Sequence, residues 1–325
     1  KALLAFEHLP QPSITHVTLK VDLFPKEIRA EATGSYQVEN RSGQALNAVH
    51  VRLDPNLKVE KLELEGATLQ KEYKEFGYRI YSLGSPMQAG ERRLLLFKTV
   101  LAQPGFVNGQ PLTRIVANGS FLNNFELTPV LGINRNIFLQ DRSKRRKYGL
   151  PAELRPAKLE DEAASAHHYL RHDSDWVTAD ITLSPDADQT PVAPGYTVSD
   201  TTANGRRTLV TKTEAPIHNF FSLQSARYEL LKDSWTGKDG KPVELSVYFH
   251  PPHASNAPRM LKAMKASLDV FSQSFSPYQF RQARILEFPA YERFAQAFAN
   301  TVPYSEAIGF VQDFDEQRGD ENIDL

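Results

Sequence analysis

The chain of 325 residues contains no cysteine. This absence excludes a disulfide scaffold, a zinc or iron–sulfur site with cysteine ligands, and a cysteine nucleophile. Long apolar runs are also missing: residues 94–97 form one of the longest, whereas a membrane-spanning helix needs about 20 apolar residues. The first residues lack the charged and then apolar pattern of a secretory signal. We therefore expect the chain as given to be a soluble domain.

Neither sign of charge is in excess, because 38 Lys and Arg residues face 39 Asp and Glu residues. The net charge of -1 creates no long-range field that would attract nucleic acid or anionic lipid, so we expect no nucleic-acid partner. The composition, 41% hydrophobic and 10% aromatic, is sufficient for a large core. The length exceeds that of one typical domain and predicts about two.

Apolar and polar residues alternate with a period of two in much of the chain, as in residues 17–23. Short turn signals separate such segments over 15–101, and no helix-length amphipathic segment intervenes, which indicates antiparallel sheets. Alternation resumes after a less regular region and ends in a strand predicted over 227–231. The fold class is therefore mainly β, with an antiparallel β-sandwich domain over residues 1–235 and an irregular insertion at 104–175.

The pattern changes towards the C-terminus. Apolar side chains at helical spacing predict a helix over 256–275. Strands are predicted on either side of it, over 243–249 and 284–288, and an edge strand is predicted over 308–311. One helix cannot cover such a sheet, so we expect residues 236–325 to be the incomplete start of an α+β domain.

Pairs of histidines are the candidate metal ligands. His168 and His172 lie four residues apart on a predicted helix that includes 159–170, a spacing with which two imidazoles can share a metal. Tyr169 stands where a zincin motif has Glu, and the surroundings are polar, so we interpret this helix as exposed surface. His250 and His253 flank two prolines, which is typical of a loop after a strand. The sequence therefore predicts no metal site in this chain.

Residues 142–147 include five cations, which can bind phosphate or an acidic partner. No aromatic residue is interleaved with them, so we interpret the segment as a solvated loop, and a contact with an acidic partner stays open. The sequence has no phosphate-binding glycine loop and no Gly-x-Ser-x-Gly elbow. Their absence argues against phosphoryl transfer and serine hydrolysis.

Aromatic rings, amides and carboxylates are concentrated in residues 287–306, between a predicted strand and the predicted edge strand. A peptide can add its backbone to a sheet edge and have its terminus bound by an acidic residue. Ordinary loop packing, with Glu306 as a surface group, is the alternative interpretation of the same residues.

The order of the parts resembles a known family. A β domain is followed by Val247-Tyr-Phe-His250, the long helix, Ile285-Leu-Glu-Phe-Pro289, a loop and Ile308-Gly-Phe-Val311. This succession is similar to that of the gluzincin zinc aminopeptidases, the family of membrane alanyl aminopeptidase and leukotriene hydrolase, and most similar to a divergent bacterial branch fused to a transporter permease. The resemblance implies a saddle-shaped β domain and a thermolysin-like catalytic domain. It is most specific over residues 244–312.

The resemblance also implies a peptide-binding loop. In the family this loop reads Gly-Ala-Met-Glu-Asn, and its Glu holds the α-amine of the substrate. Here Asn300 stands in the expected position of the acid, and the nearest carboxylate is that of Glu306. The resemblance therefore implies Glu306, Asn300, Tyr304 and Gly309 as substrate-binding residues and assigns no catalytic residue to this chain.

No His-Glu-x-x-His occurs among the 325 residues, and none of the nine histidines is followed by Glu. In the family this motif follows the edge strand and supplies zinc ligands and the general base. We therefore expect the N-terminal portion of a zinc aminopeptidase-like metallopeptidase, inactive by itself, with no cofactor in this chain and zinc in the intact protein. The expected partners are the N-terminus of a peptide substrate, the rest of the catalytic domain and a transporter membrane domain. The intact protein is expected on the extracytoplasmic side of a membrane.

Two alternatives stay open. One is a non-catalytic extracytoplasmic β-sandwich, the binding module of a membrane transporter, that presents its 104–175 insertion to a peptide, glycan or transporter partner. The other is a complete glycoside hydrolase with Glu287 and Glu292 as an acid and base pair. Whether the parent gene continues into His-Glu-x-x-His separates the metallopeptidase from the binding module.

Overall fold

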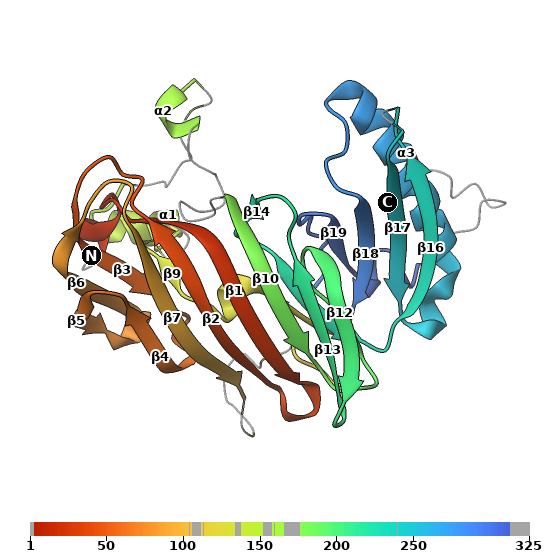
Figure 1. Ribbon diagram of the computed structural model, residues 1–325, viewed down its shortest axis with the longest axis horizontal. Coiled ribbons are helices and arrows are strands. Elements are labelled where there is room, and N and C mark those ends of the chain that lie inside the picture. The colour runs from red at the N-terminus through yellow and green to blue at the C-terminus, as the bar shows by residue number, and fades with distance from the viewer. Residues whose placement is uncertain are drawn as a thin grey trace.

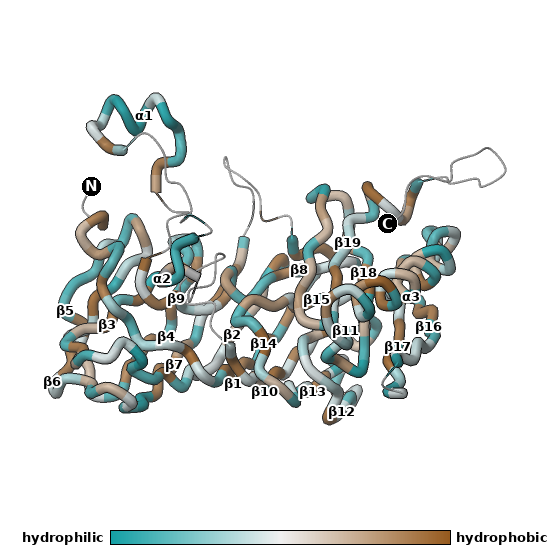
Figure 2. The backbone as a smooth tube through the Cα atoms, turned by 90° about the horizontal axis from the view of Figure 1, so that it is seen from above, coloured by the Kyte–Doolittle hydropathy of each residue, from teal (hydrophilic) through white to brown (hydrophobic). Residues whose placement is uncertain are grey.

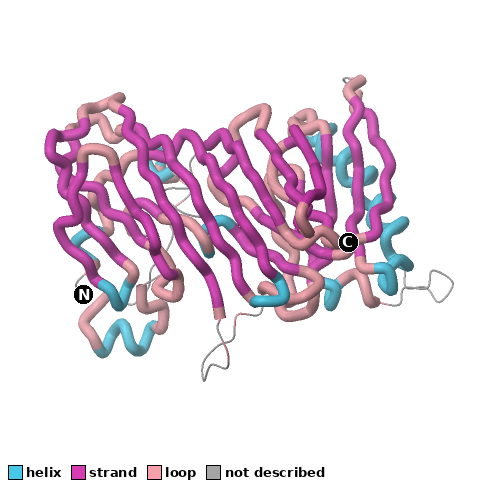
Figure 3. The backbone as a smooth tube through the Cα atoms, turned by 60° about the horizontal axis from the view of Figure 1, so that its bottom comes forward, coloured by secondary structure: helices cyan, strands magenta, loops and turns pink. Residues whose placement is uncertain are grey.

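The structure of the protein is a computed structural model in which strands predominate and one long helix lies near the C-terminus (Figures 1 and 3). This architecture confirms the predicted mainly β fold class. The model describes residues 3–103, 105, 112, 114–133, 138–151, 158, 160–165, 176–238 and 240–312.

The largest sheet has eight strands in the order β12-β13-β10-β1-β2-β7-β4, with β14 paired to β10 beside this path. β1 and β2 pair antiparallel over their full lengths, and β1 also pairs with β10 in parallel. The parallel pairing joins two segments that are far apart in the chain and lies in the middle of the sheet. The strands are β1 (Ser13–Phe24), β2 (Arg29–Glu39), β4 (Lys58–Leu64), β7 (Arg92–Ala102), β10 (Trp176–Ser184), β12 (Tyr196–Ala203), β13 (Arg206–Lys212) and β14 (Ile217–His218).

Two smaller antiparallel sheets accompany the large one, in the orders β5-β6-β3-β9 and β11-β15-β8. Their strands are β3 (Leu46–Arg52), β5 (Ala67–Tyr73), β6 (Tyr78–Met87), β8 (Ser120–Asn123), β9 (Val130–Leu131), β11 (Thr190–Val192) and β15 (Ser222–Ala226). A single turn of 3-10 helix, η1 (Leu4–Phe6), precedes β1, and further turns connect strands: η2 (Pro25–Glu27), η3 (Lys74–Phe76) and η4 (Asn124–Glu126).

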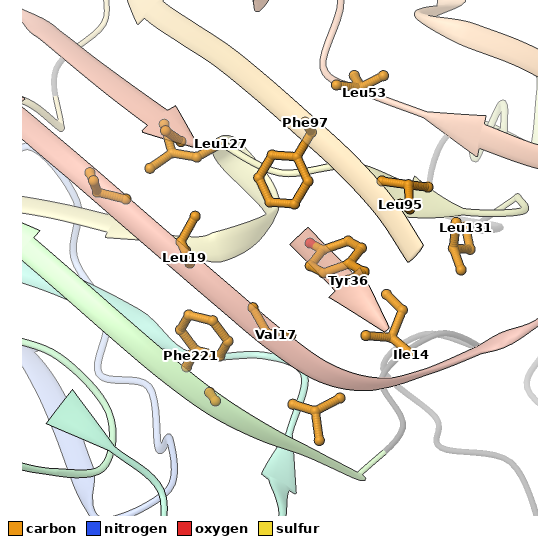
Figure 4. Close-up of a cluster of buried hydrophobic side chains, with 14 of the residues drawn as sticks. Ile14, Val17, Leu19, Tyr36, Leu53, Leu95, Phe97, Leu127, Leu131 and Phe221 are labelled. Carbon is orange, nitrogen blue, oxygen red and sulfur yellow. The ribbon is translucent and has the colours of Figure 1, made fainter. Parts of the chain in front are cut away.

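The main core lies between the large sheet and the two smaller ones (Figure 4). Alternation along the strands explains it, because successive side chains point to opposite faces. In β7, Leu95 and Phe97 are buried, whereas the side chain of Leu94, on the opposite face of the strand, is 42% exposed. Tyr36 packs its ring against Phe97, with 5.0 Å between the ring centroids.

The basic segment forms a helix, α1 (Arg142–Lys147), so its interpretation as a loop was wrong. The side chain of Asp141 accepts the N–H of Lys144 and caps the helix. Arg145 is buried and donates to the carbonyls of Pro151 at 2.6 Å and Leu139 at 2.8 Å. One of the five cations therefore anchors the helix rather than facing solvent.

Part of the short helix predicted over 159–170 is present as α2 (Glu162–Ser165). His167, His168 and His172 lie outside the described residues, so the interpretation of this histidine cluster stays a prediction. Among the helices that the structure describes, none is both long and apolar enough to cross a membrane.

The second part of the chain forms a separate four-stranded sheet in the order β16-β17-β18-β19 (Figure 1). The strands are β16 (Glu229–Thr236), β17 (Pro242–Phe249), β18 (Gln282–Phe288) and β19 (Thr301–Ser305), and the connections include η6 (Pro251–Asn256) and η7 (Glu306–Ile308). β16 runs antiparallel to β17, whereas β17, β18 and β19 are parallel. The strand predicted over 227–231 therefore belongs, by its pairing, to this second sheet.

The helix α3 (Ala257–Ser274) lies along one side of this sheet, as Figure 2 shows from above. Its side chains Met260 and Leu261 are buried against Val243, Leu245 and Val247 of β17. The observed bounds confirm the predicted helix to within one residue at each end. Towards its C-terminus, Phe271 and the C-cap residue Phe275 are exposed.

The predicted edge strand over 308–311 is wrong. Residue Ile308 ends η7, and the edge strand is β19, which lies before Glu306 instead of after it. Phe310 is buried under α3, and the side-chain amide of Asn256 donates to the carbonyls of Gly309 at 2.8 Å and Phe310 at 3.2 Å. This segment is therefore apolar because it packs on a helix, and its backbone is bound by a side chain instead of a neighbouring strand.

The two faces of β7 provide a test of the core. Leu95→Ala is expected to lower the free energy of unfolding by about 2–5 kcal/mol, because the site cannot collapse around the missing methyl groups. Leu94→Ala, one residue away on the exposed face, is expected to change it by less than about 0.5 kcal/mol. Urea unfolding followed by circular dichroism measures both. Equal effects of the two substitutions would contradict the assignment of the faces.

Candidate functional site

The parallel strands of the second sheet bring three polar side chains to one place. Because β17, β18 and β19 run in the same direction, their carboxyl ends lie at the same edge of the sheet. His250 follows β17 directly, Glu287 lies at the end of β18, and Glu306 follows β19. In sheets with parallel strands this edge is where binding sites are found.

A fourth side chain reaches the same edge because β17 is followed by two prolines. Proline lacks the N–H that a further ladder bond needs, so the strand ends at Phe249, before His250 and the prolines. The chain then turns into η6, where the N–H of His253 donates to the carbonyl of His250 at 2.8 Å. This turn places the ring of His253 beside that of His250, with 6.2 Å between the ring centroids.

Glu287 is the centre of this group, and its side chain is 0% exposed. Its Oε1 contacts the Nδ1 atoms of His250, at 3.2 Å, and of His253, in a short hydrogen bond. Its Oε2 accepts the backbone N–H of His250 at 2.6 Å. A buried carboxylate without such partners would be strongly unfavourable. Both histidines therefore help to compensate the buried carboxylate.

Glu306 closes the group on its more open side, with a side chain that is 24% exposed. Its Oε1 accepts the backbone N–H of Ala290 at 2.8 Å, and its Oε2 lies 3.9 Å from Nδ1 of His253. One ligand atom from each of the four residues lies within 4.8 Å of the others. We call His250, His253, Glu287 and Glu306 the His/Glu cluster.

The first part of the chain contributes a wall to the cluster. Gly119, which precedes β8, has φ +124°, and a Cβ there would lie 2.5 Å from the ring of Pro289 and 3.6 Å from Cε1 of His250. Only glycine fits this approach. The hydroxyl of Tyr291 donates to the carbonyl of Gly119 at 2.8 Å, and burial raises the pKa of that hydroxyl above its usual range. The cluster therefore lies where the two sheet systems meet.

A second buried phenol supports the strand that carries Glu287. The hydroxyl of Tyr228 donates to the backbone carbonyl of Glu287 at 2.8 Å, and its ring lies beside that of His250. Burial raises the pKa of Tyr228 well above its usual range, so this hydroxyl stays protonated as a donor. It fixes the position of the end of β18.

Asn300 is placed at the opposite end of β19 from Glu306. Six residues of extended chain separate them by about 20 Å. The side-chain oxygen of Asn300 accepts from Nη2 of Arg284 at 3.0 Å and from Nε2 of Gln282 at 3.2 Å. Arg284 is buried, and desolvation lowers its pKa, so the amide of Asn300 helps to compensate a buried cation. The structure therefore does not bring Asn300 together with Glu306.

Tyr304 and Gly309 pack against each other near α3. A Cβ on Gly309 would lie 2.5 Å from Cε1 of Tyr304 and 3.2 Å from Cε of Met260. Tyr304 lines a groove of about 370 Å³ between α3, β18 and β19, together with Met260, Met264, Ile285 and Val302. Of the four residues implied as substrate-binding, Glu306 alone belongs to the His/Glu cluster.

The outer edge of β19 is already hydrogen-bonded to the chain itself. The N–H of Ser305 donates to the carbonyl of Phe294 at 3.0 Å, the N–H of Gln296 to that of Pro303 at 3.1 Å, and the N–H of Phe298 to that of Thr301 at 2.8 Å. A peptide cannot add its backbone here unless residues 294–298 leave. The expectation that a peptide extends this edge is therefore wrong for the conformation observed.

Glu287 and Glu292, the acid and base of the glycoside-hydrolase alternative, each have other partners in the structure. Glu292 pairs with Arg114 at 3.3 Å, and Glu287 is surrounded by histidines. The sequence predicted a plain loop at His250 and His253 and no metal ligands. The signal that would have located the cluster is that its residues lie at or just after the C-terminal ends of three parallel strands.

Comparisons with known proteins give a fold relationship. No protein-family model matches the sequence, and no curated protein is detectably similar to it. The structure is similar to that of the M1 zinc metallopeptidase from Deinococcus radiodurans, with a TM-score of 0.61 and 15% sequence identity, over 91% of this chain and 61% of that one. The chain thus spans about three fifths of the length of the structures it matches.

Two related structures contain ligands. A mutant of the Deinococcus radiodurans enzyme bound to a Tyr-Ser-Ala substrate has a TM-score of 0.55 at 15% identity, over 90% of this chain and 60% of that one. A two-domain M1 zinc metallopeptidase mutant bound to L-arginine has a TM-score of 0.58 at 16% identity, over 91% and 61%. These metallopeptidases lend no support to a fusion with a transporter permease.

The role of Asn300 can be tested through stability. Asn300→Ala is expected to lower the free energy of unfolding by about 2–4 kcal/mol, because buried Arg284 loses an acceptor. Alanine also tolerates the left-handed backbone at φ 53° less well than asparagine. Asn300→Gly removes the acceptor and accommodates the backbone, so it is expected to cost less. Unchanged stability of Asn300→Ala would contradict this structural role.

Proposed function

We propose that this chain forms the N-terminal and cleft-forming part of an aminopeptidase-like zinc metallopeptidase, in which Glu306 binds the amino terminus of a peptide. The observation that carries the proposal is the match to M1 zinc metallopeptidases over 91% of the chain. Low identity limits that match to the fold, so the function depends on the chemistry of the residues at the sheet edge.

The charge of the His/Glu cluster favours a cation. With neutral imidazoles, Glu287 and Glu306 give it two negative charges, and their ion-pair partners among the described residues are the two histidines. A peptide ammonium that leaves water needs a carboxylate as its partner. Glu306 is the more exposed of the two carboxylates and is therefore the one that a ligand from solvent can reach.

Glu306 is also oriented for this role. The N–H of Ala290 binds Oε1, which leaves Oε2, 3.9 Å from Nδ1 of His253, for a further partner. Tyr-Ser-Ala and L-arginine, the ligands of two similar structures, each have a free α-amine, which supports an amine as the recognised group.

The sequence lacks the residues with which the resembling family hydrolyses peptides. The zinc of the resembling family needs a His-Glu-x-x-His helix, and the 325 residues do not contain that motif. The residues present therefore do not fit the family's zinc, and no catalytic step is proposed for this chain alone. The remainder of a catalytic domain is the partner that the proposal requires.

Substitution of Glu306 tests the proposal. Tyr-Ser-Ala is expected to bind the 325-residue chain at least about tenfold more tightly than N-acetyl-Tyr-Ser-Ala, because only the free amine pairs with the carboxylate. Glu306→Gln is expected to remove this preference and to leave binding of the acetylated peptide unchanged. Isothermal titration calorimetry in the presence of EDTA measures all four affinities.

Glu229→Gln is the matched control, because Glu229 is an exposed residue at the start of β16. It is expected to keep the preference for the free amine. If Glu306→Gln weakens both peptides equally, or weakens neither, Glu306 does not select the amino terminus and the proposal fails.

A further inference from the structure

We propose that the His/Glu cluster is a binding site for one divalent transition-metal ion, with zinc as the best-matched ion. The ligands are His250, His253, Glu287 and Glu306. This site uses no His-Glu-x-x-His motif. It shares Glu306 with the proposed peptide binding, so the peptide affinities are measured in EDTA and the two proposals are tested separately. It lies at the carboxyl ends of β17, β18 and β19, on rigid elements of the fold.

The spacing of the ligand atoms suits a small ion. Zinc binds imidazole nitrogen and carboxylate oxygen at about 2.0–2.2 Å, so two ligands of a tetrahedral ion lie about 3.3–3.6 Å apart. Nδ1 of His250 lies 3.2 Å from Oε1 of Glu287, and Nδ1 of His253 lies 3.9 Å from Oε2 of Glu306. Small side-chain rotations bring all four atoms to the required separation.

Each carboxylate is already held in a way that leaves one oxygen for a metal. In Glu287, Oε2 accepts the N–H of His250 and Oε1 faces the two imidazoles. In Glu306, Oε1 accepts the N–H of Ala290 and Oε2 faces His253. Backbone donors that fix the second oxygen of a ligating carboxylate are the supporting contacts that metal sites use.

The protein alone does not satisfy the cluster. The carboxylates carry two negative charges, and no Lys or Arg in the described part of the chain forms an ion pair with either of them. A divalent cation would neutralise the pair and replace the protons that the histidines otherwise share with Glu287.

The donor set selects the type of ion. Two imidazole nitrogens and two carboxylate oxygens suit zinc, and they also suit cobalt and nickel. Magnesium and calcium prefer oxygen ligands throughout, so they are not expected to compete. A bound ion would join the ends of three strands and would therefore stabilise the second sheet.

Metal titration of the purified chain, without a histidine tag and after treatment with EDTA, tests this site. We expect one zinc ion per chain, a dissociation constant in the micromolar range or below, and a higher melting temperature with zinc than with magnesium or calcium. Cobalt is expected to give the visible absorption of a four-coordinate ion. His253→Ala is expected to weaken zinc binding at least 100-fold, because it removes a ligand from the metal.

Further variants separate the possible outcomes. Glu287→Gln is expected to abolish binding, and if that buried substitution prevents folding, the part-exposed His253 provides the decisive variant, with circular dichroism as the check on its fold. His8→Ala, an exposed residue, is the control and is expected to bind zinc as the unsubstituted chain does. Absence of stoichiometric zinc would overturn the proposal. So would zinc that survives His253→Ala and is lost on substitution of His168 and His172.

The metal site and the proposed peptide binding fail separately. His253→Ala is expected to lose zinc and to keep the preference for free-amine peptides measured in EDTA. Glu306→Gln is expected to lose that preference and to keep zinc through the three other ligands, about tenfold more weakly. Absence of zinc binding by the unsubstituted chain refutes the metal site alone, and absence of a free-amine preference in EDTA refutes the peptide proposal alone.

Discussion

The parallel pairing of β17, β18 and β19 is the constraint on which the candidate site depends. Parallel strands need a connection that crosses over the sheet, and here α3 makes the first crossover. The same geometry puts the carboxyl ends of the strands at one edge, so His250, Glu287 and Glu306 meet although long stretches of chain separate them. An antiparallel β18 would have turned Glu287 to the other edge and left the two histidines without their carboxylate.

Burial of Glu287 then determines what the edge can do. A fully buried carboxylate requires donors, and the chain supplies a backbone N–H and two imidazole rings rather than an Arg or Lys. Imidazoles exchange protons near neutral pH and bind transition metals, whereas a guanidinium does neither. Because its partners are imidazoles, Glu287 belongs to a group that can bind a metal cation. A buried salt bridge to Arg or Lys would not offer ligands to a metal.

Much of the fold could be predicted from the sequence, because period-two alternation and the helical spacing of α3 are local properties. The edge strand β19 could not be predicted, because it contains Pro303. Proline inside a short polar segment argues against a strand, but an edge strand tolerates it, since one side of its ladder is unpaired by other strands. Residues 308–311 looked more like a strand because they are apolar, yet Phe310 is apolar in order to pack under α3.

This displacement of one strand accounts for the error at the site. With the edge strand placed after Glu306, the carboxylate seemed to precede the sheet edge, and the histidines after β17 had no visible partner. The buried pairing of Asn300 with Arg284 was equally hidden, because a contact between an amide and a cation leaves no periodic signal in the sequence. Local sequence patterns predicted most strands and the helix. The pairing of β17, β18 and β19 decided which side chains meet at the candidate site.

The large β domain is more than a neighbour of the site. Gly119 approaches Pro289 so closely that a Cβ would collide with the proline ring. Tyr291 and Glu292 reach back to Gly119 and Arg114. These contacts fix the loop that carries Ala290, whose N–H orients Glu306. The position of Glu306 is thus set by residues from both sheet systems. A second sheet cut away from the β domain would keep its strands but lose the orientation of the exposed carboxylate.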